Sequence, residues 1–86
     1  MPTMPHPLLT STQLGALLQA TRKAQGLTQA TLASRLGLSQ SRVSHLELNA
    51  HEMSVAQLLA WCAALGLELG MGRRGAPASS SATTDW

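Results

Sequence analysis

The stretch from Leu27 to Leu48, LTQATLASRLGLSQSRVSHLEL, constrains the fold of this chain more than any other. Thr28 is a predicted N-cap, and the apolar residues that follow it fall on one stripe of a helix. Gly37 is a predicted stop, because glycine adopts the left-handed conformation that ends a helix without a Cβ clash. Ser39 is placed to cap the next helix. The stretch therefore predicts two short helices joined by a tight turn.

The second of these helices, residues 40–48, is mostly polar. Its apolar positions are Val43, Leu46 and, at its end, Leu48. Amide, hydroxyl, guanidinium and imidazole groups are left to face outward, and such groups read base edges in the major groove. An ordinary solvated face is the alternative for each residue alone, but the whole set favours contact with DNA. The candidate DNA-binding residues are Thr28, Gln29, Ser39, Gln40, Ser41, Arg42, Ser44 and His45.

These candidates differ in the contact expected of them. Gln29 begins the first helix, where a helix N-terminus can approach a phosphate. Gln40 suits adenine and Arg42 suits guanine, and both lie in the N-terminal turn that reaches furthest into the major groove. Ser44 and His45 lie one turn further on, where either a base or a phosphate is a suitable partner.

Two further helices are predicted around this motif. Thr10 and Gln13 have capping-box spacing, so a helix is expected from Thr10 or Ser11 to about residue 25. Arg22 falls on or beside its apolar stripe, which is unusual for a charge without a partner. Another helix is expected from residue 54 to about residue 65, and it is apolar on more than one side.

A helix that is apolar on two sides needs two surfaces to pack against. One side of residues 54–65 is therefore expected to contact a second subunit, with a folded-back tail as the alternative. Residues 67–71 alternate in the manner of a strand, which has nothing to pair with in its own chain. The predicted dimer interface consists of Trp61, Leu65, Leu67, Leu69 and Met71.

Composition limits the remaining interpretations. The 86 residues suffice for one small domain, and their net charge of +2 permits a nucleic-acid partner without requiring one. The single Cys62 cannot form an internal disulfide, and no apolar run approaches the ~20 residues of a membrane span, so a cytoplasmic protein is expected. No glycine-rich phosphate loop, nucleophile–base pair or metal-ligand spacing is found, so neither an enzyme nor a cofactor is predicted.

Three segments are expected along the chain. Residues 1–9 contain three prolines and predict a flexible arm, residues 10–72 form the domain, and residues 73–86 form a disordered polar tail. Arg73 and Arg74 lie at the start of the tail. They are suited to contact a phosphate, and the alternative is that they only make the end of the strand soluble. Trp86 is unusual in such a tail, because tryptophan is enriched at binding hot spots.

The motif residues resemble those of the Cro/C1 (XRE) family of DNA-binding repressors, and more narrowly the HipB antitoxins. The family likeness rests on Thr28-Gln29, Leu32-Ala33, Leu36-Gly37-Leu38-Ser39 and Val43-Ser44-His45-Leu46-Glu47. The narrower likeness runs from Ser11-Thr12-Gln13-Leu14 through Leu67-Glu68-Leu69 to a polar tail with a terminal tryptophan.

The resemblance implies an all-α, lambda-repressor-like helix-turn-helix bundle of four to five helices, with a short C-terminal strand pairing across a homodimer. It also implies a salt bridge between Arg22 and Glu47, for which two solvated side chains are the alternative. Trp86 becomes a candidate toxin contact or protease handle, or it has no role.

The function implied is that of a transcriptional repressor and antitoxin. Such a protein binds a palindromic operator in double-stranded DNA as a homodimer and restrains a HipA-like Ser/Thr kinase. The alternative is a helix-turn-helix interaction module without sequence-specific DNA binding, for which the low positive charge and Leu48 and Ala50 leave room.

Overall fold

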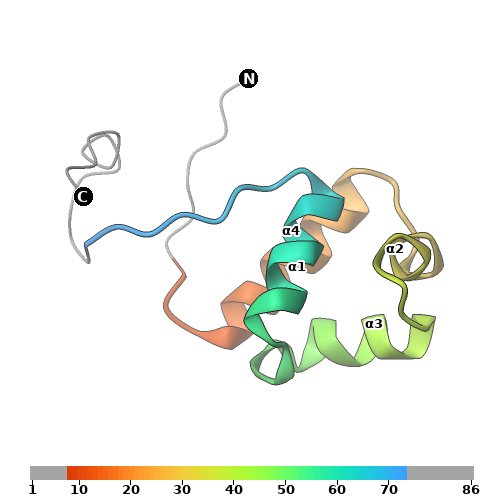
Figure 1. The fold of residues 1–86 in the computed structure, drawn as a ribbon, viewed down its shortest axis with the longest axis horizontal. Coiled ribbons are helices and arrows are strands. Elements are labelled where there is room, and N and C mark those ends of the chain that lie inside the picture. Colours follow the sequence, from red (N-terminus) through yellow and green to blue (C-terminus); the bar gives the residue numbers. More distant parts are fainter. Residues whose placement is uncertain (1–7, 74–86) are drawn as a thin grey trace.

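Four α-helices and one short 3-10 helix make up residues 8–73, the part of the chain that the computed structural model describes. They are α1 (Ser11–Ala24), α2 (Gln29–Leu36), α3 (Gln40–Leu48), η1 (Ala50–Glu52) and α4 (Val55–Leu65). The fold is an all-α, lambda-repressor-like bundle, in which a sharp turn joins α2 to α3 (Figure 1). The N-terminal arm, apart from its last two residues, and nearly all of the tail, including Trp86, lie outside the described residues.

Each α-helix is preceded by a residue whose side-chain hydroxyl caps it, and the caps at Thr28 and Ser39 are as the sequence predicts. The side chains of Thr10, Thr28, Ser39 and Ser54 each accept the backbone N–H of the third residue of their helix. Such a cap satisfies one of the backbone donors that a helix leaves unpaired at its start. Gly37 ends α2 in the left-handed conformation, with φ 68°. The local sequence therefore sets where α2 ends and where α3 begins.

The core lies where α1, α2, α3 and α4 meet. Leu18, Leu32, Val43, Leu46 and Trp61 are its largest fully buried side chains. The prediction that Trp61 and Leu65 face a second subunit is wrong, because both are already buried within one chain. The exposed fractions are 0% for Trp61 and 2% for Leu65. The indole Nε1 of Trp61 has no hydrogen-bond partner in the described part of the chain.

α1 approaches the end of α3 closely, and Gly15 permits the approach. A Cβ at Gly15 would collide with the carbonyl oxygen of Glu47 and would lie 3.6 Å from the Cβ of Ala50. Only a residue without a side chain fits here. Gly15 therefore brings α1 against both α3 and η1, and so helps to fix the position of α3.

The segment after α4 runs away from the bundle (Figure 1). Leu67 packs against the core, whereas Leu69 and Met71 are exposed. Residues 8–73 form no strand within the single chain, so the pairing of residues 67–71 between two subunits stays a prediction. None of the described helices combines the length and apolar character that crossing a membrane requires.

Candidate nucleic-acid interface

The helix α3 carries five of the eight candidate DNA-binding side chains, and four of these five lie on its outer face. Val43, Leu46 and Glu47 anchor the helix on its buried side. The opposite side is open to solvent, and Ser44 lies between the two sides, half-buried. The exposed members are Gln40, Ser41, Arg42, His45 and Leu48. The helix therefore presents one polar stripe on an anchored backbone, as the sequence predicts.

The two capping residues among the candidates have their hydroxyls engaged. Thr28 accepts the N–H of Thr31 at 3.0 Å and donates to the hydroxyl of the same residue at 3.0 Å. Ser39 accepts the N–H of Arg42 at 3.1 Å, and its oxygen lies 3.2 Å from the hydroxyl of Ser41. Both residues remain exposed. Their main contribution is to fix the N-terminal turns of α2 and α3.

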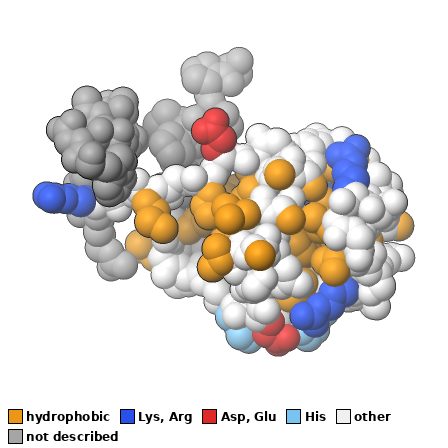
Figure 2. Space-filling model, viewed as in Figure 1, with side chains coloured by type: hydrophobic (Ala, Val, Ile, Leu, Met, Phe, Trp, Pro, Cys, Tyr) orange, Lys and Arg blue, Asp and Glu red, His pale blue; other side chains and the backbone are white. Residues whose placement is uncertain are grey.

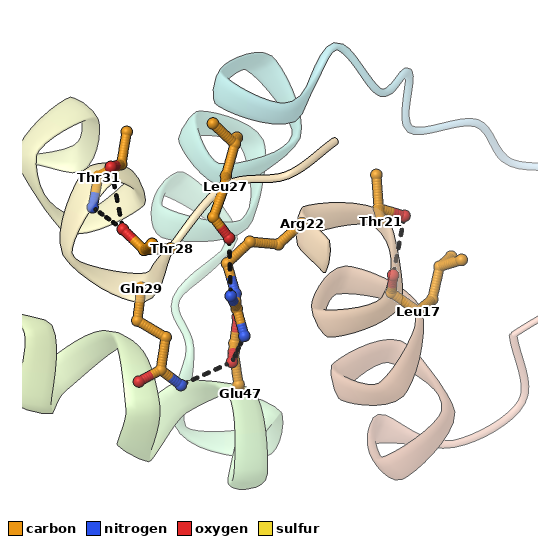
Figure 3. Close-up of polar contacts among 8 residues, drawn as sticks. All are labelled: Leu17, Thr21, Arg22, Leu27, Thr28, Gln29, Thr31 and Glu47. Atoms are coloured by element: carbon orange, nitrogen blue, oxygen red, sulfur yellow. Dashed lines mark hydrogen bonds and ion pairs between the residues drawn. The ribbon is translucent and has the colours of Figure 1, made fainter. Parts of the chain in front are cut away.

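The ion pair expected between Arg22 and Glu47 is present and joins α1 to the end of α3 (Figure 3). The Nε of Arg22 donates to Oε2 of Glu47 at 2.6 Å, and Nη2 donates to Oε1 at 3.2 Å. Nη1 of the same guanidinium donates to the carbonyl of Leu27 at 2.9 Å. The side chains are only 7% and 1% exposed. This two-point contact excludes water and holds α1, α3 and the α1–α2 connection together.

Glu47 also holds a candidate phosphate-binding residue. The amide Nε2 of Gln29 donates to Oε1 of Glu47 at 3.1 Å (Figure 3). One of the two amide hydrogens is therefore engaged inside the protein. The second amide hydrogen and the backbone N–H of Gln29 remain for an external oxygen. The sequence indicates the position of Gln29 at the start of α2, but not this tie to α3.

His45 is paired with a carboxylate that the sequence does not suggest. Its Nε2 lies 2.9 Å from Oε1 of Glu52, in η1, and the Nε2 of His51 lies 3.7 Å from the other oxygen. The hydrogen bond from His45 holds the pKa of Glu52 below its usual range, and the charge of Arg42 acts in the same direction. Histidine, acidic and basic side chains lie together at the lower edge of the view, beside α3 (Figure 2).

This cluster is not a metal site. Within residues 8–73, no group of three His, Cys, Asp or Glu side chains is arranged to hold a metal ion. The thiol of Cys62 is buried, and burial raises its pKa, which favours the protonated form at neutral pH.

The two apolar residues after the polar stripe of α3 have different roles. Ala50 is buried beneath Gly15, with an exposed fraction of 6%, so it serves to pack η1 against α1. Leu48 is 77% exposed at the end of α3. Of these two residues, only Leu48 adds an apolar side chain to the exposed polar face of α3.

The capped turn between α2 and α3, with a polar α3 face held by a buried ion pair, defines a helix-turn-helix domain of the DNA-binding type. A model of the helix-turn-helix family HTH_3, the Cro/C1 type, matches residues 18–71. The chain therefore belongs to this family. No curated protein matches it by sequence.

Solved structures of HipB share the fold. A HipA–HipB–O2–O3 complex matches with 23% identity and a TM-score of 0.74, covering 80% of this chain and 97% of that one. A HipB–O1–O2 complex matches with 24% identity and a TM-score of 0.73, covering 79% and 99%. A HipB–O4 20-mer complex matches with 23% identity and a TM-score of 0.74, covering 80% and 97%. At this identity the match shows a common fold.

Proposed function

We propose that this protein is a transcriptional repressor that binds a specific palindromic operator in duplex DNA as a homodimer. The observation that carries the proposal is the exposed polar stripe of α3, which includes Gln40, Arg42 and His45, on a helix anchored by Val43 and Leu46. A helix of this kind fits the major groove, where its N-terminal residues meet base edges. The similarity in fold to HipB in complexes with O1–O2 and O4 supports the assignment.

Some of these residues would position the protein on the DNA backbone, and others would recognise the base sequence. The N-termini of α2 and α3 supply backbone donors for phosphates, with Gln29 adding its free amide hydrogen. Arg42 is the candidate for a guanine and Gln40 the candidate for an adenine. Glu47 acts from behind this surface, since it contacts both Arg22 and Gln29.

A homodimer gives the uncovered apolar surface of α4 a partner. Leu59 is 50% exposed and Val55 is 70% exposed, and the outer face of α4 otherwise carries only exposed alanines at 56, 60 and 63. Apolar side chains gather over the face on which α4 lies (Figure 2). Leu69 and Met71 are exposed in the segment that follows. With a net charge of only +2, two copies would also be needed to neutralise enough phosphates.

The experiment that tests DNA recognition is selection of bound sites from random duplexes by the full chain at a stated salt concentration. We expect an inverted repeat with half-sites about one helical turn apart. On the selected site, Arg42→Ala should lose roughly 10- to 100-fold in affinity. Arg35→Ala is the matched control, because Arg35 is an exposed arginine outside α3. Binding without any selected motif, weakening steadily with salt, would overturn the proposal.

We further propose that the protein is a cytoplasmic antitoxin that restrains a HipA-like kinase. The HipA–HipB–O2–O3 complex, which shares the fold, supports this proposal. The measurement is inhibition of a purified HipA-like kinase from the same genome by the full chain and by Trp86→Ala. A smaller inhibition by the variant would assign the terminal tryptophan to the toxin contact. If the full chain neither binds nor inhibits such a kinase, the antitoxin proposal fails while repression stands.

A protein-interaction module without sequence-specific DNA binding is the second candidate. The exposed Leu48 at the end of α3 favours it, because an apolar side chain on this face suits a protein partner. This candidate requires Arg42→Ala and Arg35→Ala to have the same affinity for every duplex. The selection experiment therefore separates the two candidates.

A further inference from the structure

The contact between His45 of α3 and Glu52 of η1 lies on the polar face of the recognition helix. Oε1 of Glu52 is 2.9 Å from Nε2 of His45. We propose that Glu52 is a positioning residue for base recognition, which fixes His45 as a hydrogen-bond acceptor toward DNA. The inference rests on the proposed function, because it concerns which base His45 reads.

The backbone holds these two side chains at a fixed separation. α3 ends at Leu48, and the next residue, Asn49, caps it: the backbone N–H and the side-chain amide of Asn49 both donate to the carbonyl of His45, at 2.9 and 3.0 Å. The chain then turns into η1, where Ala50 is buried against α1. Glu52 follows one turn later, and its N–H donates to the carbonyl of Asn49 at 3.0 Å. The two residues are therefore held on neighbouring turns of the backbone, close enough for the carboxylate of Glu52 to reach His45.

The charge of Glu52 determines which nitrogen of His45 carries the proton. A glutamate whose pKa is ordinary or lowered is ionised at neutral pH, so the carboxylate of Glu52 only accepts hydrogen bonds. Nε2 of His45 must then be the donor, and in the neutral imidazole Nδ1 is left with a lone pair. Nδ1 has no partner among residues 8–73. The side chain of His45 is 45% exposed, so an external group has access to it.

An acceptor in the major groove selects among the bases. The exocyclic amino groups of cytosine and adenine are the donors there, whereas guanine and thymine present acceptors. His45 held by Glu52 should therefore favour cytosine or adenine at the base that it faces. Without Glu52 both tautomers of His45 are available, and this preference should decline.

The test measures discrimination rather than affinity alone. The full chain, Glu52→Gln, His45→Ala and the double variant are titrated against the selected operator and against duplexes with each base pair changed in turn. Glu52→Gln keeps the shape but can donate as well as accept, so it no longer selects a tautomer. Glu68→Gln is the matched control, because it removes the same charge from an exposed carboxylate outside α3 and η1.

We expect Glu52→Gln to reduce the preference for cytosine or adenine about three- to tenfold at one base pair per half-site, as loss of one hydrogen bond would. Discrimination at the other positions should remain, even if the lost negative charge raises affinity for all duplexes. His45→Ala should reduce discrimination at the same position, and the double variant should lose no more than His45→Ala alone. Glu68→Gln should leave the pattern unchanged.

Three results would overturn the inference. The first is an unchanged pattern for Glu52→Gln, and the second is a wild-type preference for guanine or thymine at the position that depends on His45. The third is an equal effect of Glu52→Gln with and without His45, which would show that Glu52 acts through its charge alone. In each case the wild-type protein still selects a site, so the proposed function survives. Failure of the wild type to select any site overturns the proposed function instead.

Discussion

Replacement of Glu47 by alanine tests the ion pair that organises this fold. The variant removes the carboxylate that binds Arg22 through Nε and Nη2. The guanidinium then keeps one internal acceptor, the carbonyl of Leu27, and remains buried with a side-chain exposure of 7%. Gln29 also loses the acceptor of its amide. The expected loss therefore comes from a buried charge without its counter-ion.

Breaking a buried ion pair on one side costs ~3–5 kcal/mol. A domain of this size has a free energy of unfolding of ~5 kcal/mol. Glu47→Ala should therefore be close to unfolded at 25 °C. With a urea m-value of ~1 kcal/mol/M, the midpoint should fall by roughly 3 M or more. Loss of the Gln29 contact should add little, because that side chain is partly exposed.

The assay is urea unfolding followed by circular dichroism at one fixed protein concentration, since a dimer would make the midpoint depend on concentration. The control replaces both partners, as Arg22→Met with Glu47→Leu, and leaves no buried charge. Such apolar replacements of buried pairs are often neutral, so we expect this double variant to recover most of the stability. A free energy of unfolding for Glu47→Ala within ~0.5 kcal/mol of wild type, the range of ordinary surface substitutions, would refute the reasoning.

Three further predictions concern α1, α4 and η1. Gly15→Ala should lose about 1–3 kcal/mol of unfolding free energy in urea, because its Cβ would collide with the backbone of α3 although alanine favours helix; equal stability would disprove the close approach. Leu59→Glu should make the protein monomeric in sedimentation equilibrium with unchanged helix content, whereas Ala20→Glu on the exposed face of α1 should not; a monomeric wild type would disprove the dimer. The pKa of Glu52 is lower in the folded protein than in the unfolded chain. Its contribution to the free energy of unfolding is therefore fully present above the unfolded-state pKa and is lost as pH falls through the folded-state pKa. NMR titration should show that pKa rising in His45→Ala, and an unchanged value would contradict the contact with His45.

The helix boundaries could be predicted because they depend on neighbouring residues. The hydroxyl caps at Thr28 and Ser39 and the stop at Gly37 involve atoms only a few positions apart. A capping bond has much the same geometry in any protein, so the pattern alone identifies it. The pair of Arg22 and Glu47 is separated by 25 positions. It was accessible only through the family resemblance, together with a charge on an apolar stripe.

The remaining features depend on which elements lie close together in the folded protein, and the local sequence pattern does not contain that information. On a helix that is apolar on two sides, a residue such as Trp61 fits a subunit interface and a core equally well. In this structure α1 and α2 pack against α4 and bury Trp61 in the core. Gly15 gives no signal in sequence, since a glycine inside a predicted helix only weakens the prediction. The partner of His45 could not be found either, because it requires the turn at Asn49 and the 3-10 geometry of η1 to be known.

Two of the four acidic residues of this chain contact candidate DNA-binding side chains. Glu47 holds Gln29 from the buried side, and Glu52 holds His45 at the edge of the same surface. Negative charges near the phosphates reduce affinity for any duplex, whatever its sequence. Their contacts with Gln29 and His45 therefore serve orientation rather than attraction to DNA, because each contact limits the directions in which an amide or an imidazole can bind. A net charge of +2 implies weak binding to duplexes of any sequence. The contacts of the oriented side chains with bases then supply a larger part of the free energy of binding to the specific site, so the low charge is compatible with DNA recognition.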